Sequence, residues 1–390
     1  MSDDNGSIKL SVIENKGRAL ISSRPLMAGE IILKDSPILV YSAAPLAAAA
    51  NFCSHCFRKI SPHSQTTVAC PNCSNSSLFC SPQCQSISLS TSHTPFVCQS
   101  LIRLAAADSP LLSHHHNHHI RHVQARFLVS AYNLAIVSPP NFQTLLSLQG
   151  EPSIDDTSVF LHSLISSVCN SSNLGQLGLS VELTSALLAK DEMNSFGLME
   201  PFNPDNKERS VRAYGIYPRA SFFNHDCLPN ACRFDYVDSV SDFTNTDIFV
   251  RVLHDLPAGR EICLSYFPVN IKYSERQKRL KEDYGFTCVC DRCNVESNWS
   301  DHEDEMGGED EDEDMDEDDG NDVEDDVEAT GNGGGDDEEI DDFPHAYFFY
   351  KYMCGTEKCG GTLAPLPPSD VGPSTTMECH VCGNLSKCED

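Results

Sequence analysis

The sequence predicts an α+β protein that contains several zinc sites, and three observations support this fold class. Apolar and polar residues alternate over residues 8–42, a pattern typical of short strands. Apolar residues recur at helical spacing over residues 99–190. Most of the 19 cysteines lie in groups with the spacing of metal ligands. A small β-domain, a helical region and zinc modules are therefore expected in one chain of 390 residues.

Residues 8–42 predict the first strands. Their sequence, IKLSVIENKGRALISSRPLMAGEIILKDSPILVYS, alternates as a strand with one buried face does. Gly17 and Gly29 interrupt the alternation, which indicates tight turns between short strands. We expect residues 8–52 to form the first half of a split β-domain.

Residues 53–98 predict two zinc ions. They hold eight candidate ligands in four pairs: Cys53 and Cys56, Cys70 and Cys73, Cys80 and Cys84, and His93 and Cys98. A disulfide framework is the alternative, but residues 1–30 lack the apolar core of a secretion signal. No stretch reaches the length of a membrane span. We therefore expect a soluble chain in a reducing compartment, where grouped cysteines bind metal.

Residues 99–190 predict a helical insert. The segments IRHVQARFLVSAYNLAIV and SVFLHSLISSVC place apolar side chains three and four residues apart. The histidine-rich run at 114–122 permits a metal site. We expect a polar loop there instead, because no ordered framework is evident around it.

Residues 191–273 predict the second half of the β-domain, which resumes near Asn194 and ends near Phe267. This part contains SFFNHDCLPNACRF at 221–234 and EICLSYF at 261–267. Asn230 follows a proline, as in a turn, so we expect it to stabilise a local chain crossing.

Residues 274–293 predict a short amphipathic helix that leads into a third zinc site. The basic side chains of SERQKRLKEDYGF are expected on a solvated helix face, and a weak nuclear signal is the other interpretation. Cys288, Cys290 and Cys293 follow this helix. Tetrahedral zinc needs a fourth ligand, and Cys227 is the candidate.

The net charge of −30 comes mainly from one segment. Residues 301–342 contain 25 of the 57 acidic residues and no Lys or Arg, which leaves 32 acidic against 27 basic residues elsewhere. Such a segment buries too little apolar surface to fold, so we expect an acidic disordered linker. It is interpreted as a solvated spacer or as an acidic arm that contacts basic partners.

Residues 343–390 predict a fourth zinc site in a ribbon-like tail. Its cysteines flank the turn-rich stretch GGTLAPLPP and are Cys354, Cys359, Cys379 and Cys382. The remaining cysteines have no expected ligand role. We expect Cys169, Cys232 and Cys263 to be buried and Cys388 to lie in a frayed end.

These motifs together resemble a known family. The segments around NHDCLPN, LSYF and CVCDRC occur in the order found in SET-domain protein-lysine methyltransferases. The four pairs in 53–98 are similar to a MYND finger, in which pairs interleave. The resemblance is therefore to the SET and MYND domain protein-lysine methyltransferase family, in a short plant-type form. It implies a split β-rich SET domain with an inserted MYND zinc finger and a helical insert, a post-SET zinc cluster and a C-terminal zinc ribbon.

The resemblance also implies roles for individual residues. Interleaving assigns one finger ion to Cys53, Cys56, Cys80 and Cys84 and the other to Cys70, Cys73, His93 and Cys98. Tyr266 is the implied catalytic residue, and Tyr284 the wall of the lysine channel. The implied contacts to S-adenosylmethionine come from Gly17 and Arg18 in a loop, from Asn194, Asn224 and His225, and from Phe286 stacked on adenine. Three or four zinc ions are expected.

The implied function is S-adenosylmethionine-dependent methylation of a protein lysine, with histone lysine as the expected substrate. A catalytically weak SET/MYND adaptor in chromatin or transcription is the alternative. Direct nucleic-acid binding is not expected from an acidic chain. We further expect a monomer without membrane association, in the nucleus, the cytoplasm or both.

Overall fold

The computed structural model of this chain describes residues 6–44, 51–61, 64–73, 77–111, 118–169, 178–203, 205, 209–238, 245–298, 345–370 and 372–387. The acidic segment at 301–342 and Cys388 lie outside the described residues, so the expectations for them remain predictions.

The first strands lie where the alternating pattern predicts them. They are β1 (Ile8–Ile13), β2 (Gly17–Ser22), β3 (Ile31–Asp35) and β4 (Leu39–Ser42). β1 and β2 form an antiparallel hairpin. Gly17 opens β2 with a φ of 75°, which glycine adopts without a steric penalty. β3 and β4 instead pair with strands from the second half of the chain.

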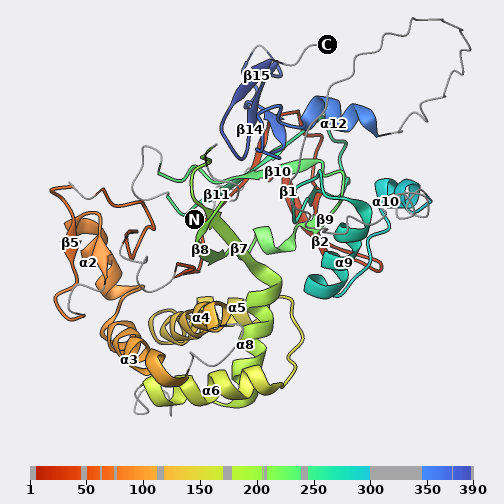
Figure 1. Ribbon diagram of the computed structural model, residues 1–390. Helices are drawn as coiled ribbons and strands as arrows, with labels where there is room; N and C mark the ends of the chain where they lie inside the picture. The colour runs from red at the N-terminus through yellow and green to blue at the C-terminus, as the bar shows by residue number, and fades with distance from the viewer. Residues whose placement is uncertain are drawn as a thin grey trace, which may run out of the picture.

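Late strands complete the sheets. They are β7 (Ser195–Met199), β8 (Val211–Ile216), β9 (Asn224–His225), β10 (Ala231–Phe234), β11 (Ile248–Val252) and β12 (Cys263–Leu264). These strands and the early ones form two three-stranded sheets of the β-domain, with the orders β10-β11-β3 and β4-β8-β7, and β9 pairs with β12 in parallel. Each of these two sheets thus joins one early strand to two late ones, as a split β-domain requires. Figure 1 shows these strands in the middle of the molecule.

Asn230 holds the chain crossing that precedes the last strand. Its side-chain oxygen accepts a hydrogen bond from the Cys263 amide at 2.9 Å, and its side-chain nitrogen donates to the Glu261 carbonyl at 2.8 Å. These bonds fix the start of β12 against the segment before β10, which confirms the structural role expected for Asn230. The chain leaves β12 directly toward Tyr266.

Helices form an insert at the bottom of Figure 1. They are α3 (Pro95–Leu111), α4 (His118–Val137), α5 (Pro139–Leu146), α6 (Asp156–Val168) and α8 (Val181–Asn194). α4 is central: it packs against the other four helices and against β4. Phe127, Leu128 and Tyr132 are fully buried there. The insert therefore has its own apolar core and rests on the edge of the β-domain.

Two helices extend past the limits expected from the sequence. α3 begins before Cys98 and carries it, so one helix continues from the zinc-ligand region into the insert. α4 begins at His118, which makes the expected polar loop over 114–122 wrong for its second half. The physical reason is that the apolar spacing of α4 includes His122, which is buried.

The finger (residues 51–98) lies at the left of Figure 1 and contains β5 (Val68–Ala69), β6 (Leu78–Phe79) and α2 (Pro82–Ser90). Arg212 of β8 holds it to the sheet. This arginine is buried, donates to the Phe57 carbonyl at 2.9 Å and pairs with Asp238 at 2.9 Å. Its guanidinium also lies 5.1 Å from the Phe52 ring. Because a buried cation is costly without such partners, these contacts define where the finger attaches.

Two short helices follow β12, and a small three-stranded module ends the described chain. The helices are α9 (Tyr273–Tyr284) and α10 (Asp291–Glu296). The module, called the ribbon (residues 345–387), contains α12 (Ala346–Tyr352), β13 (Leu363–Pro365), β14 (Thr376–Cys379) and β15 (Leu385–Lys387). It lies at the top of Figure 1, next to β10 and β11.

Arg251 of β11 holds the ribbon as Arg212 holds the finger. It is buried, donates to the Pro365 carbonyl at 3.1 Å and forms an ion pair with Glu378. Its guanidinium lies 3.6 Å from the centroid of the Phe234 ring. Apolar side chains of β10 and of the ribbon share one buried cluster around these contacts. The ribbon is therefore packed on the β-domain as part of one folded unit.

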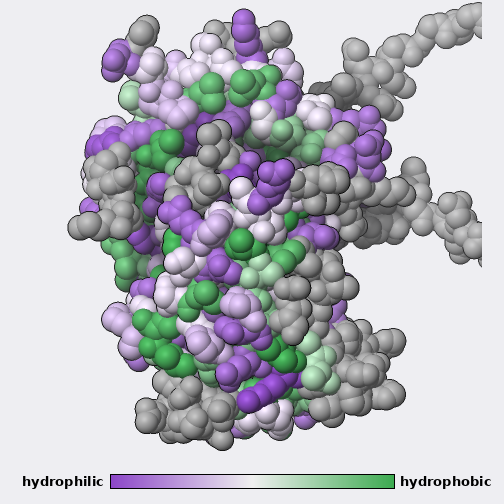
Figure 2. All heavy atoms as spheres, turned by 90° about the vertical axis from the view of Figure 1, so that its left-hand side faces the viewer, coloured by the Kyte–Doolittle hydropathy of each residue, from purple (hydrophilic) through white to green (hydrophobic). Residues whose placement is uncertain are grey.

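The face of the molecule on the finger side carries interspersed hydrophobic and hydrophilic side chains (Figure 2). None of the helices in the described residues combines the length and the apolar character that crossing a membrane requires.

Candidate active site

Four cysteines meet beside the strand pair β9 and β12. The sulfur of Cys227 lies 3.9 Å from that of Cys288 and 3.5 Å from that of Cys293, and Cys290 completes the group. Four thiolates about 2.3 Å from a tetrahedral zinc ion would be about 3.8 Å apart. The donor set and its spacing thus fit zinc. The structure therefore brings Cys227 to the three cysteines with which the sequence pairs it.

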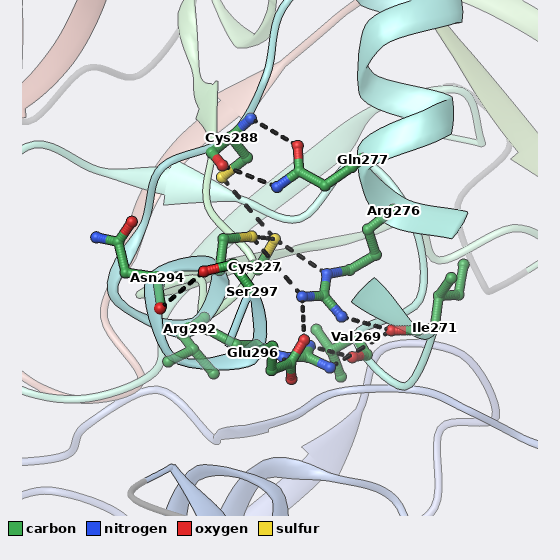
Figure 3. Close-up of polar contacts among 12 residues, drawn as sticks. Cys227, Val269, Ile271, Arg276, Gln277, Cys288, Arg292, Asn294, Glu296 and Ser297 are labelled. Carbon is green, nitrogen blue, oxygen red and sulfur yellow. Dashed lines mark hydrogen bonds and ion pairs between the residues drawn. The ribbon is translucent and has the colours of Figure 1, made fainter. Parts of the chain in front are cut away.

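Arg276 of α9 lies against this thiolate group (Figure 3). Its Nε donates to the Cys227 sulfur at 3.3 Å, and its terminal nitrogens donate to the Ile271 carbonyl at 2.7 Å and pair with Glu296 at 2.5 Å. The side chain is fully buried. The expectation of a solvated basic face is therefore wrong for Arg276, because thiolates and carbonyls supply its acceptors. Sequence spacing alone carried no signal for this contact.

His225 links the cysteine group to Tyr266. The Tyr266 amide donates to His225 Nδ1 at 3.1 Å, so the ring proton resides on Nε2. That nitrogen lies 3.3 Å from the Cys227 sulfur, an acceptor when ionised. Burial lowers the pKa of His225 to about 4, which keeps the ring neutral. A zinc ligand and the backbone of Tyr266 are thus held by the same imidazole.

Tyr266 and Tyr284 face one another at the reaction centre expected from the sequence. Their ring centroids are 4.7 Å apart. The Tyr266 hydroxyl donates to the Phe223 carbonyl at 3.0 Å. Burial, and then the neighbouring Tyr284, raise the pKa of Tyr266, so its hydroxyl keeps its proton at neutral pH. The Tyr266 oxygen therefore retains lone pairs to accept a hydrogen bond from a bound molecule.

Phe286 presents an aromatic face next to this centre. Gly285 ends α9 with a φ of 74°, and this turn sends the chain from Tyr284 to Phe286. The Phe286 ring lies 6.4 Å from that of His225 and is 38% exposed. An accessible ring beside polar backbone is suited to an adenine. These residues fit the adenine end of S-adenosylmethionine.

Glu261 organises the loop in which Gly17 lies, and no sequence motif had selected this residue. Its carboxylate pairs with Lys16 at 2.7 Å and accepts from the Asn224 side chain at 2.9 Å. Lys16 directly precedes Gly17, so this pair ties the N-terminal loop to β9 and β12. The signal is absent from local sequence, since Lys16 and Glu261 are 245 residues apart.

Arg18 and Asn194 contact the helical insert. Arg18 donates to the Ser147 carbonyl at 3.1 Å and lies 4.8 Å from the Phe222 ring. Asn194 ends α8, and its side-chain nitrogen donates to the carbonyls of Gln149 at 2.7 Å and Lys190 at 2.8 Å. Both predicted residues thus lie where the insert meets the β-domain, with these donors engaged by protein carbonyls.

A cavity of about 820 Å³ opens from the reaction centre. Among the predicted residues, Tyr266, Tyr284 and Asn194 line it, whereas Gly17, Arg18, Asn224, His225 and Phe286 do not. The predicted catalytic tyrosines are therefore at the boundary between this cavity and most of the predicted cofactor residues. The cavity continues to the ribbon, which contributes part of its wall.

The other predicted zinc ligands form three further groups, each with its ligand atoms within 4.8 Å of one another. They are Cys53, Cys56, Cys80 and Cys84; Cys70, Cys73, His93 and Cys98; and Cys354, Cys359, Cys379 and Cys382. His93 faces its group through Nε2, 3.7 Å from the Cys73 sulfur. Burial lowers the pKa of His93, which keeps it a neutral donor of a lone pair. The finger pairs interleave, and all donor sets fit tetrahedral zinc.

Comparisons with known proteins relate the chain to one family. Residues 17–267 match the family model described as SET domain. Histone-lysine N-methyltransferase ASHR2 of Arabidopsis thaliana is 52% identical over 409 residues, covering 100% of this chain and 99% of that protein. A SET and MYND domain-containing protein of Dictyostelium discoideum is 23% identical, covering 76% of this chain and 84% of its own. The crystal structure of the SET domain of LSMT bound to lysine and AdoHcy is 14% identical, with 73% of this chain and 53% of that one covered, at a TM-score of 0.28.

Proposed function

The chain belongs to the SET-domain protein-lysine methyltransferases, and from this premise we propose how its residues bind a protein lysine and direct its methylation. The observation that carries the proposal is that Tyr266 lines the cavity and that its hydroxyl donates a hydrogen bond to the Phe223 carbonyl. S-adenosylmethionine supplies an electrophilic methyl group on a sulfonium. The protein must hold the lysine amine in line with that methyl.

The proposed substrate path is the cavity that Tyr266 and Tyr284 line. Because the Tyr266 proton is donated to Phe223, its oxygen accepts an N–H of the incoming amine and orients the remaining lone pair. The amine must arrive without its ammonium proton, and the aromatic walls favour the neutral form by excluding water. With S-adenosylmethionine bound, the nitrogen lone pair so oriented would form the new N–C bond while the C–S bonding electrons returned to sulfur.

The proposed cofactor side is the opposite face of the same tyrosine pair. We assign the Phe286 ring to the adenine. The polar amino-acid end of the cofactor is assigned to Asn224 and to the loop with Gly17 and Arg18, which Glu261 joins through its contacts to Asn224 and Lys16. Asn194 reaches both the insert and the cavity wall. The Cys227 group contacts His225 and includes Cys288, which follows Phe286 by two residues. Zinc removal is thus expected to disturb cofactor binding as well as stability.

The proposed substrate is histone lysine, because the 52% identical relative is named a histone-lysine N-methyltransferase. Action in the nucleus follows from that substrate. Cytoplasmic proteins remain a second substrate pool, and we propose that the enzyme works as a monomer without binding nucleic acid directly. Methylation of separated nuclear and cytoplasmic extracts distinguishes the two pools.

Tyr266→Phe tests the proposal because it removes one oxygen and keeps the ring. We expect kcat on mixed histones to fall about 100-fold, since one transition-state contact of this kind has that magnitude, with S-adenosylmethionine affinity unchanged. Tyr214→Phe is the matched control, since Tyr214 lies in β8 away from the cavity.

Calorimetry measures cofactor binding, and transfer of a labelled methyl group measures activity. A zinc-replete, folded protein that binds no S-adenosylmethionine would contradict the enzyme and support the adaptor alternative. Full activity of Tyr266→Phe would contradict the assigned role of its hydroxyl.

A further inference from the structure

The cavity that leads to Tyr266 has one wall from the β-domain and another from the ribbon. Strands β7 and β10 supply residues on the first side. The ribbon supplies Lys358, Cys359, Gly360, Thr362, His380 and Val381. A lysine that reaches Tyr266 through this cavity therefore brings its neighbouring residues against the ribbon.

The ribbon wall is rigidly placed. Arg251 is bound to Pro365 and Glu378 of the ribbon, and the two modules share a buried apolar cluster. Gly29, in the turn before β3, approaches so closely that an added Cβ would lie 2.2 Å from the Leu366 carbonyl oxygen. A wall fixed in this way can select among substrates, because it does not yield to each one.

Basic side chains outnumber acidic ones among the described residues that line the cavity. They are Arg209, Arg233, Arg279 and Lys358 against Glu192 and Asp235. Four thiolates around a divalent ion in the ribbon would carry a formal charge of about −2, which offsets this excess. The net charge of the cavity lining therefore does not predict whether the cavity binds an anion or a cation. The selection depends on which N–H donors are still available.

Two of these arginines keep most of their N–H donors unused, Arg279, which lies 3.9 Å from Asp283, and Arg209. The Nε of Arg209 donates to the Glu200 carbonyl at 3.2 Å, and no carboxylate of the described residues lies within 4.0 Å of its guanidinium. By contrast, Arg233 donates to the Gly197 carbonyl at 3.0 Å and lies 3.9 Å from Asp235. Burial lowers the pKa of Arg209, and the nearby Asp235 carboxylate opposes this shift without reversing it.

The planar guanidinium of an arginine matches a carboxylate with two parallel N–H bonds. Lys358, on the same cavity wall and directly before the zinc ligand Cys359, adds an exposed ammonium that lies 3.7 Å from the exposed Glu357 carboxylate. Its backbone has a φ of 59°, an unfavourable value for lysine that the loop nevertheless imposes. Both cations are therefore positioned toward the path of a substrate.

We propose that Arg209, together with Lys358 of the ribbon, binds a carboxylate side chain of the substrate, so that the enzyme prefers lysines with an aspartate or glutamate nearby. This inference rests on the proposed function and names its substrate class. The ribbon is then a specificity-determining part of the enzyme, and Arg209 a substrate-binding residue.

A positional-scanning peptide library with one central lysine tests the preference. Each flanking position is fixed in turn as Glu, Gln or Lys, and kcat/KM is measured with the full chain. We expect Glu to exceed Gln by about tenfold at one position or more, the value for about 1.4 kcal/mol of binding. Lys at that position is expected to rank below Gln.

Arg209→Gln is expected to bring the Glu-to-Gln ratio of kcat/KM to about one, because it removes the guanidinium that would bind the carboxylate. Lys358→Ala is expected to lower the ratio by about threefold, as for an exposed charge pair. Arg209→Lys is expected to keep part of the preference, since it retains the charge without the planar pair of donors. Arg103→Gln is the matched control. Arg103 is an exposed arginine of α3 that donates to one carbonyl, that of Val168 at 3.2 Å.

The outcomes separate this inference from the proposed function. Equal rates on Glu, Gln and Lys peptides, or a preference for Lys, would overturn the inference and leave the methyltransferase intact. A Glu preference that survives in Arg209→Gln would also overturn it. If no peptide is methylated, fluorescence anisotropy of labelled Glu and Gln peptides decides the same question, with tighter Glu binding expected in wild type and lost in Arg209→Gln. Thermal unfolding and S-adenosylmethionine binding confirm that each variant is folded.

Discussion

Two zinc-ligand modules flank the β-domain, the finger (51–98) and the ribbon (345–387). Each is held by one buried arginine from a central strand, Arg212 for the finger and Arg251 for the ribbon. Each arginine donates to a backbone carbonyl of its module and pairs with a carboxylate. The two attachments are alike in chemistry, yet the ribbon lines the cavity at Tyr266 and the finger does not.

This difference shows that similar metal modules serve different parts of the molecule according to where they attach. The finger contacts β8 and the start of the insert, where its loss would leave the cavity wall in place. The ribbon packs on β10 and β11, whose residues also face the cavity. Paired variants of the two modules can therefore separate stability from substrate binding.

Loss of a metal ligand gives the largest expected contrast. Cys379→Ser in the ribbon is expected to lower kcat/KM for protein substrate about 100-fold, because a wall that holds the substrate would be displaced. Cys53→Ser in the finger is expected to remove zinc as well but to leave kcat/KM near the wild-type value below the unfolding temperature. Metal analysis and methyl transfer measure the two effects. Equal losses of activity in both variants would break the comparison.

Removal of the attaching arginines gives the next effect. Arg251→Met and Arg212→Met each leave a carboxylate without its cation, at an expected cost of about 3 to 5 kcal/mol in the free energy of unfolding. Only Arg251→Met is expected to raise the KM for protein substrate, by about tenfold. Denaturant unfolding and steady-state kinetics check both expectations. A raised KM in Arg212→Met would show that the finger also reaches the substrate.

Two glycine-to-alanine substitutions test the contact between the β-domain and the ribbon, with the smallest expected effect. Gly29→Ala and Gly259→Ala share the cost of a positive φ, about 1 kcal/mol for an alanine. Gly29→Ala adds a clash with Leu366 of the ribbon, whereas no atom lies within 4 Å of a Cβ at Gly259. We expect Gly29→Ala to lose a further 1 to 3 kcal/mol, as overpacking does. Equal unfolding temperatures for the two variants would contradict the tight ribbon contact.

Sequence patterns predicted much of the fold, and the misses have physical causes. Alternation located the strands in 8–42, and apolar spacing located the helices of the insert. The histidine run was assigned to a loop because histidine is polar, but α4 continues through His122 and buries it. The basic helix α9 was assigned a solvated face, whereas Arg276 finds acceptors in thiolates that come from other segments.

The sequence by itself determined which side chains could bind zinc, while the proposed roles of Tyr266 and Tyr284 came from the family resemblance of their motifs. Residue type and short spacing are local properties, and a tetrahedral ion demands four ligands wherever they occur. Only the tertiary structure decided that the ribbon borders the cavity, that Glu261 joins Lys16 to Asn224, and that Arg209 keeps unused donors. These contacts join residues far apart in the chain, where desolvation and hydrogen bonding act and no local pattern records them.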